Sequence, residues 1–155
     1  IVAQSVNKLT VSDFDPVFIE DAKSRHEDKW NMDYLVHNLI ESPTKKLFNA
    51  IYLCDVFEHI NPSDERIFLE NALKSLKIDG TMIIGIPSLE SQALIKPEDR
   101  DPGHVNCKSG VDLKSTLEAY FNNVFLFSMN DEVIHTGHHK MAHYIFCLCC
   151  YPKKF

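Results

Sequence analysis

Two short, almost wholly apolar segments, residues 49–54 and 81–86, constrain the fold more than any other feature of the sequence. Runs of this length without polar alternation are typical of strands that are covered on both faces, as in parallel sheets. Between them, apolar residues from Leu69 to Leu76 recur at the three- and four-residue spacing of one helix face. A buried strand, an amphipathic helix and a second buried strand predict an α/β unit with parallel strands.

The rest of the chain continues this alternation. Further strands are expected at residues 9–11, 34–37, 124–129 and 144–150. Helices are expected to begin at Pro16, near Ser63 and after Ser109. Turns are expected at 78–80 and 135–139, and a long loop at 88–108. The last two strands are too close for a crossover helix, so we expect them to pair as an antiparallel hairpin at one edge of the sheet. This order predicts a doubly wound, mostly parallel α/β sheet with helices on both faces and a C-terminal antiparallel hairpin.

Composition narrows the class of protein. The 155 residues, of which 45% are hydrophobic, are expected to form one domain around one core. The net charge of -6 argues against a nucleic-acid partner, and no apolar run approaches the ~20 residues of a membrane helix, so no membrane partner is expected. The five cysteines include no CxxC pair and are interpreted as reduced, small apolar side chains of a cytoplasmic protein.

Polar residues stand where the predicted strands end. In open α/β sheets, ligands bind beyond the carboxyl ends of the strands, and Asp13, Asn38 and Asp55 follow three of the apolar segments. A carboxylate at the position of Asp13 suits a ribose diol, because it accepts hydrogen bonds from both hydroxyls. A turn or helix-capping role is the alternative for Asp13, although Asp15, directly before Pro16, is better placed as the cap.

Four segments carry a family resemblance. LTVSDFDPVFIEDAK, LVHNLIE, FNAIYLCDVFEHI and LENALKSLKIDGTMIIGIPS resemble, in order and spacing, consecutive motifs of class I S-adenosylmethionine-dependent methyltransferases, in particular the branch that methylates small molecules. The resemblance implies a Rossmann-like fold, S-adenosylmethionine as the cofactor, and transfer of its methyl group to an oxygen, or alternatively a nitrogen, of a small-molecule acceptor. The family's first strand and glycine-rich loop would precede Ile1, so residues 1–155 are expected to form a single methyltransferase domain that is N-terminally incomplete.

The resemblance also assigns cofactor-binding residues. It implies that Asp13 binds the ribose hydroxyls and that Phe14 lies against the adenine. Asn38, with Leu39 beside it, stands where the family usually has an aspartate that contacts the adenine amino group. The amide oxygen of Asn38 can accept the same hydrogen bond, so the role is expected to persist in weaker form.

The segment after residues 49–54 is expected to carry the reaction. The resemblance implies that Cys54 and Asp55 line the methionine portion of the cofactor. His59 and His104 are each candidate catalytic bases for an acceptor hydroxyl, because an imidazole can take up a proton near neutral pH.

A metal site is a second interpretation of this segment. If a helical turn starts at Asp55, then Asp55, Glu58 and His59 share one face, and His104 can complete a set of oxygen and nitrogen ligands for a divalent cation. Some relatives, among them quinone-pathway O-methyltransferases and RNA 3′-end methyltransferases, look similar here and hold a metal. Support of the loop by hydrogen bonds, or contact with substrate, is the alternative for Glu58 and His59. The sequence leaves the metal, the acceptor and the oligomeric state open.

Two further interpretations compete with the enzyme. One is a catalytically inactive methyltransferase-like domain that binds a partner or a nucleotide, which Asn38 and the lack of a glycine-rich loop favour. The other, a nicotinamide-dependent oxidoreductase, needs the same loop and does not explain the DVFEHI segment. The histidines around Gly137 are interpreted as a surface turn, with a substrate lid as the alternative.

Overall fold

The computed structural model describes residues 1–25 and 30–154, and the chain divides into two compact units, Ile1–Ser42 and Pro43–Phe155. In the first unit, β1 (Leu9–Asp13) and β2 (Met32–Val36) form a two-stranded parallel sheet, with Asp13 opposite Val36. The helix α1 (Pro16–Ser24) packs against both strands, and a single 3-10 turn, η1 (Val2–Gln4), precedes them.

The start of α1 confirms the predicted capping residue. Asp15 has an extended backbone, and its side chain accepts a hydrogen bond from the backbone N–H of Val17 at 2.8 Å. Pro16 occupies the first helical position, where its missing N–H is not needed. Ile19 is the buried residue of this helix and anchors it to the unit.

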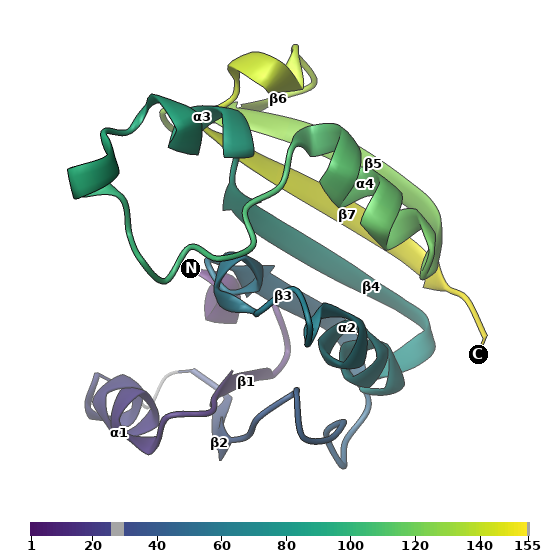
Figure 1. Ribbon diagram of the computed structural model, residues 1–155. Coiled ribbons are helices and arrows are strands. Elements are labelled where there is room, and N and C mark those ends of the chain that lie inside the picture. The colour runs from purple at the N-terminus through teal and green to yellow at the C-terminus, as the bar shows by residue number, and fades with distance from the viewer. Residues whose placement is uncertain (26–29, 155) are drawn as a thin grey trace. The chain divides into compact units, whose positions relative to one another are not determined.

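The second unit is built on a five-stranded sheet in the order β3-β4-β7-β5-β6 (Figure 1). Its strands are β3 (Phe48–Cys54), β4 (Leu76–Pro87), β5 (Phe121–Asn130), β6 (Val133–His135) and β7 (Tyr144–Pro152). β3 and β4 are parallel, and β7 is antiparallel to both β4 and β5. Therefore β3, β4 and β5 share one direction, and the predicted antiparallel pairing of the last two long strands is confirmed. The predicted place of this pair at the edge of the sheet is wrong, because β7 lies between β4 and β5 and β6 is the edge strand.

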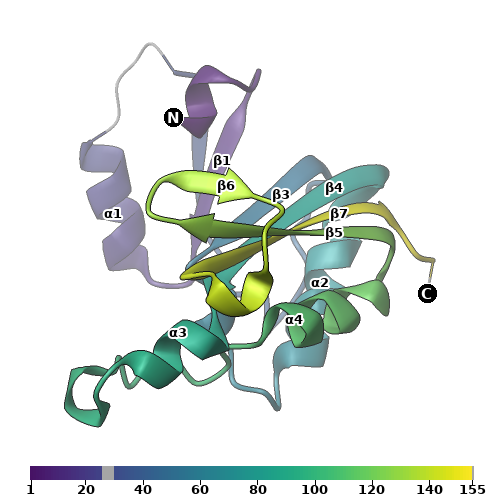
Figure 2. The ribbon, with the colours of Figure 1, turned by 90° about the horizontal axis from the view of Figure 1, so that it is seen from above.

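Two helices cover one face of this sheet. Figures 1 and 2 show α2 (Glu65–Lys74) and α4 (Gly110–Glu118) on the same side. The strand residues on that side form the core; Ile84, Ile86 and Cys147 are all fully buried. On the opposite side, Tyr52 and Phe125 remain more than half exposed.

Two local predictions were wrong, and a third was incomplete. Residues 78–80 are not a separate turn but part of β4, at the place where its register with β3 shifts. The loop 88–108 contains α3 (Leu89–Leu94) and a 3-10 turn, η3 (Pro97–Asp99); α3 forms because the Ser88 hydroxyl accepts a hydrogen bond from the N–H of Ser91 and caps it. The predicted turn at 135–139 is present, but it is shorter than expected and lies between β6, which ends at His135, and η4 (His139–Met141). β6 forms because Asn130 pairs with Val133 across a two-residue connection.

No helix in the described part of the chain combines the length and the apolar character that crossing a lipid bilayer requires.

The buried face of β4 generates a stability prediction. Ile84 is 0% exposed and Ile78, in the same strand, is 67% exposed. We expect Ile84→Ala to lower the free energy of unfolding by about 2–5 kcal/mol, because it removes packed methyl groups and leaves a cavity. Ile78→Ala, the matched control, is expected to change it by about 0.5 kcal/mol or less. Urea denaturation of the full chain measures both, and equal effects would contradict the assignment of the core face.

Candidate functional site

In the first unit, the two parallel strands bring Asp13 and the segment after β2 to one edge. The backbone N–H of His37 donates to the Asp13 carbonyl at 2.8 Å. The Asp13 carboxylate accepts a hydrogen bond from the N–H of Asp15 at 2.8 Å through Oδ1, so the turn role considered for this residue is also present. Phe14 is 71% exposed, which leaves its ring accessible to a planar ligand.

Asn38 and Leu39 lie in the turn that follows β2. The Asn38 Oδ1 accepts a hydrogen bond from the N–H of Ile40 at 3.0 Å, and its Nδ2 donates to Glu41 Oε1 at 3.1 Å. Leu39 is half-buried. Because a carbonyl oxygen has two lone pairs, the Asn38 amide oxygen retains the capacity for a second hydrogen bond.

In the second unit, β3 ends at Cys54 and the chain turns at Asp55. Asp55 has a φ of 55°, in the left-handed region that few residues with a Cβ adopt and that aspartate tolerates better than most. Its N–H donates to the carbonyl oxygen of Gly85 at 3.2 Å and to the hydroxyl of Tyr144 at 3.1 Å. Burial raises the pKa of the Cys54 thiol, and hydrogen bonding to Cys54 raises the pKa of Tyr52 to about 12, so both groups are neutral near pH 7.

Tyr144 was missed as a candidate site residue by the sequence analysis, which places it only at the start of an expected strand. Its ring packs against that of Phe146 at a centroid distance of 4.8 Å, with the two planes tilted by 49°. Both rings lie over Gly85, where an added Cβ would come within 2.6 Å of Phe146 and 2.7 Å of Tyr144. Only the pairing of β7 with β4 brings Tyr144 to Asp55, and that pairing leaves no local signal in the sequence.

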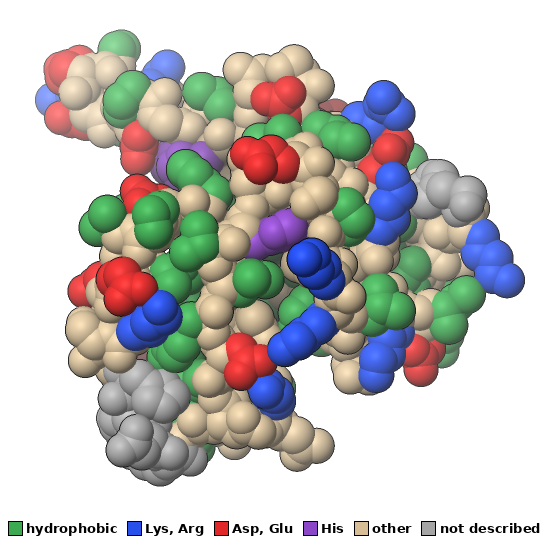
Figure 3. Space-filling model, turned by 90° about the horizontal axis from the view of Figure 1, so that it is seen from below, with side chains coloured by type: hydrophobic (Ala, Val, Ile, Leu, Met, Phe, Trp, Pro, Cys, Tyr) green, Lys and Arg blue, Asp and Glu red, His purple; other side chains and the backbone are tan. Residues whose placement is uncertain are grey.

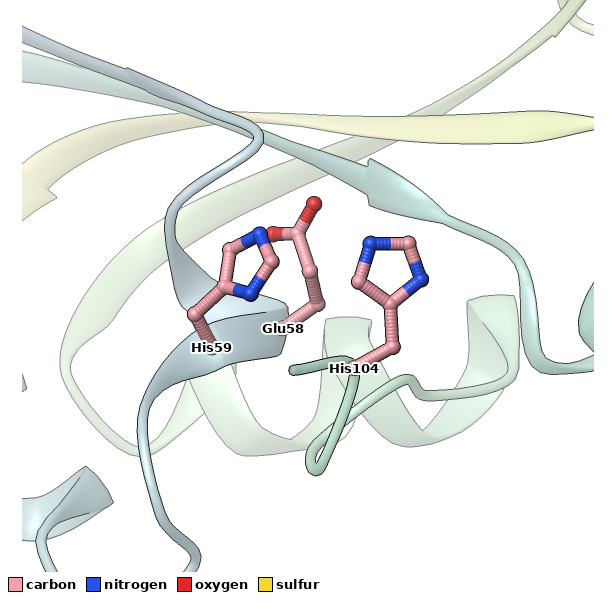
Figure 4. A group of neighbouring side chains, drawn as sticks. All are labelled: Glu58, His59 and His104. Carbon is pink, nitrogen blue, oxygen red and sulfur yellow. The ribbon is translucent and has the colours of Figure 1, made fainter. Parts of the chain in front are cut away.

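The two predicted catalytic histidines lie together with Glu58. Glu58 and His59 come from the 3-10 turn η2 (Phe57–His59), and His104 comes from the loop after η3. One ligand atom from each of the three lies within 4.8 Å of the others, and Figure 4 shows the Glu58 carboxylate between the two imidazole rings. Among the described residues, Asp55 is not part of this group, because the helical turn begins after it.

Hydrogen bonds orient both imidazoles. His59 Nδ1 lies 3.0 Å from the carbonyl oxygen of Gly103, and His104 Nδ1 lies 3.1 Å from Gln92 Oε1. Since both partners are acceptors, Nδ1 is the donor in each ring, and Nε2 is the ring nitrogen left for a second contact. Nε2 of His104 lies 3.7 Å from Oδ2 of Asp101. His59 is exposed, and histidine side chains reach the surface in the view of Figure 3. Each Nε2 can therefore accept a proton or bind a cation.

The Glu58 carboxylate is the electrostatic centre of the group. The residue is 0% exposed, and neither carboxylate oxygen has a hydrogen-bond partner among the described residues. Burial raises the pKa of Glu58, and His59 and His104 act in the opposite direction. A buried carboxylate without partners is costly when ionised, so a proton, a protonated imidazole or a bound cation is needed beside it.

A network of polar side chains holds the His104 loop against η2. The backbone N–H of Asn106 donates to the carbonyl of Glu58 at 2.9 Å. Glu65, at the start of α2, accepts from the Asn106 amide at 2.9 Å and pairs with Lys108 Nζ at 2.9 Å. These contacts connect η2, α2 and the loop, so the positions of the two histidines depend on one another.

Comparison with known families identifies the chain. A family model described as "Methyltransferase domain" matches residues 1–84, which is more than half of the sequence. The chain therefore belongs to the methyltransferase domain family, and the predicted class, an S-adenosylmethionine-dependent methyltransferase, is confirmed. No curated protein matches it in sequence.

Solved structures show the same fold. The N-methyltransferase NodS from Bradyrhizobium japonicum WM9, in complex with S-adenosyl-L-homocysteine, is 18% identical, with a TM-score of 0.68 over 98% of this chain and 70% of that one. Magnesium protoporphyrin IX methyltransferase from Synechocystis PCC 6803, also with S-adenosylhomocysteine, is 13% identical (TM-score 0.68; 96% and 66%). A putative methyltransferase of Haloferax volcanii, in complex with the Trm112 activator, is 13% identical (TM-score 0.73; 93% and 72%). The predicted α/β fold class is thereby confirmed.

The raised pKa of Glu58 generates a pH prediction. Over a range of pH, Glu58 keeps its proton in the folded protein and loses it in the unfolded chain. The free energy of unfolding therefore falls as the pH rises from the ordinary glutamate pKa of roughly 4.3 to the raised pKa of folded Glu58. In chelator-treated protein at pH 8, we expect the free energy of unfolding of Glu58→Gln to exceed that of the wild type by about 1–3 kcal/mol. We expect this difference to vanish toward pH 4. Denaturation at several pH values measures it.

Glu98→Gln is the matched control, because Glu98 is exposed in η3. A gain for Glu58→Gln that does not depend on pH would contradict the inferred electrostatic cost.

Proposed function

We propose that this methyltransferase transfers the methyl group of S-adenosylmethionine to an oxygen of a small-molecule acceptor, with His59 and His104 at the acceptor and a nitrogen acceptor as the second candidate. The pair of imidazoles carries this proposal: their Nδ1–H groups face Gly103 O and Gln92 Oε1, and their Nε2 atoms remain available beside the buried Glu58. A hydroxyl group loses a proton when it is methylated, whereas many amines do not need a base of this kind, so a proton acceptor favours oxygen.

Cofactor binding is proposed for the residues that the family resemblance implies. In the first unit, Asp13 binds the ribose hydroxyls, Phe14 lies against the adenine, and Asn38 and Leu39 contact the adenine. NodS and the protoporphyrin methyltransferase, which share the fold, were both crystallised with S-adenosylhomocysteine, which supports this.

In the second unit, Cys54 and Asp55 line the methionine portion of the cofactor. The left-handed backbone of Asp55 is of the kind that occurs at ligand-binding positions. The family match extends from the first unit into the second, which supports treating residues 1–155 as one methyltransferase domain.

The proposed reaction is a direct displacement. A lone pair of the acceptor oxygen attacks the methyl carbon, the carbon–sulfur bond breaks, and its electron pair returns to sulfur, which becomes a neutral thioether. The hydroxyl proton passes to Nε2 of His59 or His104. The protein contributes alignment of the oxygen with the methyl carbon and exclusion of water, and the imidazole supplies the base.

A divalent cation is a second candidate for the same group. Glu58 offers a buried carboxylate without partners, and His59 and His104 offer Nε2 atoms whose rings are already oriented through Nδ1. These donors fit a cation that accepts nitrogen and oxygen ligands, and all three would hold it. When bound, it would lower the pKa of an acceptor hydroxyl.

Binding of S-adenosylhomocysteine tests the assigned cofactor residue. We expect Asp13→Ala to weaken binding about ten- to a hundredfold, because a charged acceptor for the ribose hydroxyls is lost. Asp79→Ala is the control, since Asp79 is exposed within β4. Calorimetric titration of the full chain measures both. Equal affinities of wild type and Asp13→Ala would refute the assignment, and a wild type that binds nothing would refute the function.

Methyl transfer tests the two histidines. With hydroxyl-bearing acceptors and release of S-adenosylhomocysteine as the readout, we expect His59→Ala and His104→Ala to lower the rate about 10²- to 10⁴-fold. His138→Ala, in the exposed turn, is expected to leave the rate unchanged. A rate that is insensitive to chelator favours the imidazole as base. Loss with chelator and recovery with Mg²⁺ or Mn²⁺ favours the cation, and cofactor binding without transfer to any acceptor favours the inactive domain.

A further inference from the structure

A pocket of about 240 Å³ lies beside α3, at the carboxyl ends of β4 and β5. Pro87, Ile95, Met129 and Tyr144 give it apolar walls, and all of its lining residues belong to the second unit. Its volume is below the roughly 300–1,000 Å³ of sites for drug-sized ligands, so it suits a molecule with one ring.

Two lining residues connect this pocket to the proposed reacting groups. Gln92 lines it, and its side-chain oxygen accepts the hydrogen bond from His104 Nδ1 at 3.1 Å. Tyr144 also lines it, and its hydroxyl accepts from the N–H of Asp55 at 3.1 Å. The pocket is therefore bounded on one side by a partner of the candidate base and on another by a partner of a candidate cofactor residue.

Hydrogen bonds between three segments hold the walls of the pocket. The Ser88 hydroxyl donates to the carbonyl of Ala142 at 2.6 Å, and the Ser91 hydroxyl contacts the carbonyl of His143 at 2.9 Å. The N–H of His143 donates to Asn130 Oδ1 at 2.8 Å. These bonds join α3, the end of β5 and the start of β7, so the pocket exists before a ligand binds.

Two polar side chains line the pocket without partners. Asp131 and His143 form no side-chain hydrogen bond or ion pair with any residue in the described part of the chain, and both are exposed to solvent. Asp131 has a φ of 51° in the tight connection between β5 and β6, a conformation that aspartate tolerates better than most residues. Its carboxylate is the charged group of this pocket, and it attracts cations and repels anions.

We propose that this pocket is the acceptor site, and that it selects a compact acceptor with an apolar ring and a cationic amine bound by Asp131. The inference rests on the proposed methyl transfer to oxygen and adds the class of acceptor. The ring lies between Met129, Ile95 and Tyr144, the ammonium group pairs with Asp131, and His143 provides a further polar contact. Acceptors with a carboxylate in place of the amine are rejected, because the like charge of Asp131 opposes them.

Three matched phenols test the proposal on the full chain with S-adenosylhomocysteine present: tyramine, tyrosol and 4-hydroxyphenylacetate, which end in an ammonium, a hydroxyl and a carboxylate. Calorimetric titration is expected to rank their affinities in that order. Asp131→Asn should weaken tyramine binding about five- to tenfold and leave tyrosol unchanged, since only the charged contact is lost. Glu132→Gln, the neighbouring exposed acid, should change neither.

A second pair of variants tests the position of the site without altering charge. Ile95→Trp fills the pocket and should abolish tyramine binding, whereas Leu94→Trp, at an 88% exposed neighbour, should not. Retained S-adenosylhomocysteine binding shows that each variant is folded. No binding of any phenol, preference for the carboxylate, or indifference to Asp131→Asn and Ile95→Trp overturns the proposal. In all of these cases the proposed function stands if S-adenosylhomocysteine binds and another hydroxyl-bearing acceptor is methylated. It fails if S-adenosylhomocysteine does not bind, or if it binds and no acceptor is methylated.

Discussion

β7 is hydrogen-bonded along both of its edges, to β4 on one side and β5 on the other, and the second unit depends on this double pairing. The strand runs against both neighbours, so its first residue, Tyr144, arrives at the carboxyl ends of β4 and β5, opposite Pro87. Alternate residues such as Ile145, Cys147 and Cys149 are fully buried under the helices. The same pairing brings the Tyr144 hydroxyl to the N–H of Asp55, 89 positions away in the sequence. The stability of the sheet and the arrangement of the candidate site therefore both depend on β7.

The central feature of the candidate site is the free-energy cost of ionising the buried Glu58 carboxylate. A fully buried Glu58 without partners opposes its own ionisation, and two imidazoles beside it are the groups that can offset this charge. The arrangement is held by contacts that are individually ordinary: an Asn106 N–H on the Glu58 carbonyl, and Glu65 between Asn106 and Lys108. These contacts come from three different segments. The loss of one of them therefore changes the position of a histidine as well as the Glu65–Lys108 salt bridge.

Short-range features were predictable to a large extent. The apolar runs at β3 and β4, the Asp15 and Ser109 caps and the pairing of the last two long strands were predicted and are observed. The helix α3 was missed because the charged and proline-containing residues around it suggested a loop, while its Ser88 cap has the same form as the caps that were found. The short strand β6 was missed because it exists only through pairing with β5, and edge pairing has no periodic pattern of its own over three residues.

Residue type and position in the chain were sufficient to predict Asp13 as a candidate ligand contact, because a polar residue after a strand lies at the ligand-binding edge of an α/β sheet. They also predicted His59 and His104 as candidate bases, because an imidazole can take up a proton near neutral pH. The order of the motifs along the chain was also sufficient to predict the methyltransferase family. Folding in three dimensions added what depends on distant segments meeting: the grouping of Glu58 with the two histidines and without Asp55, the Tyr144 contact to Asp55, and the pocket beside α3. Capping and periodicity act over a few residues and can be recognised locally. Burial of a carboxylate and the register between strands arise from the packing of the whole sheet, so they appear only once that sheet is assembled.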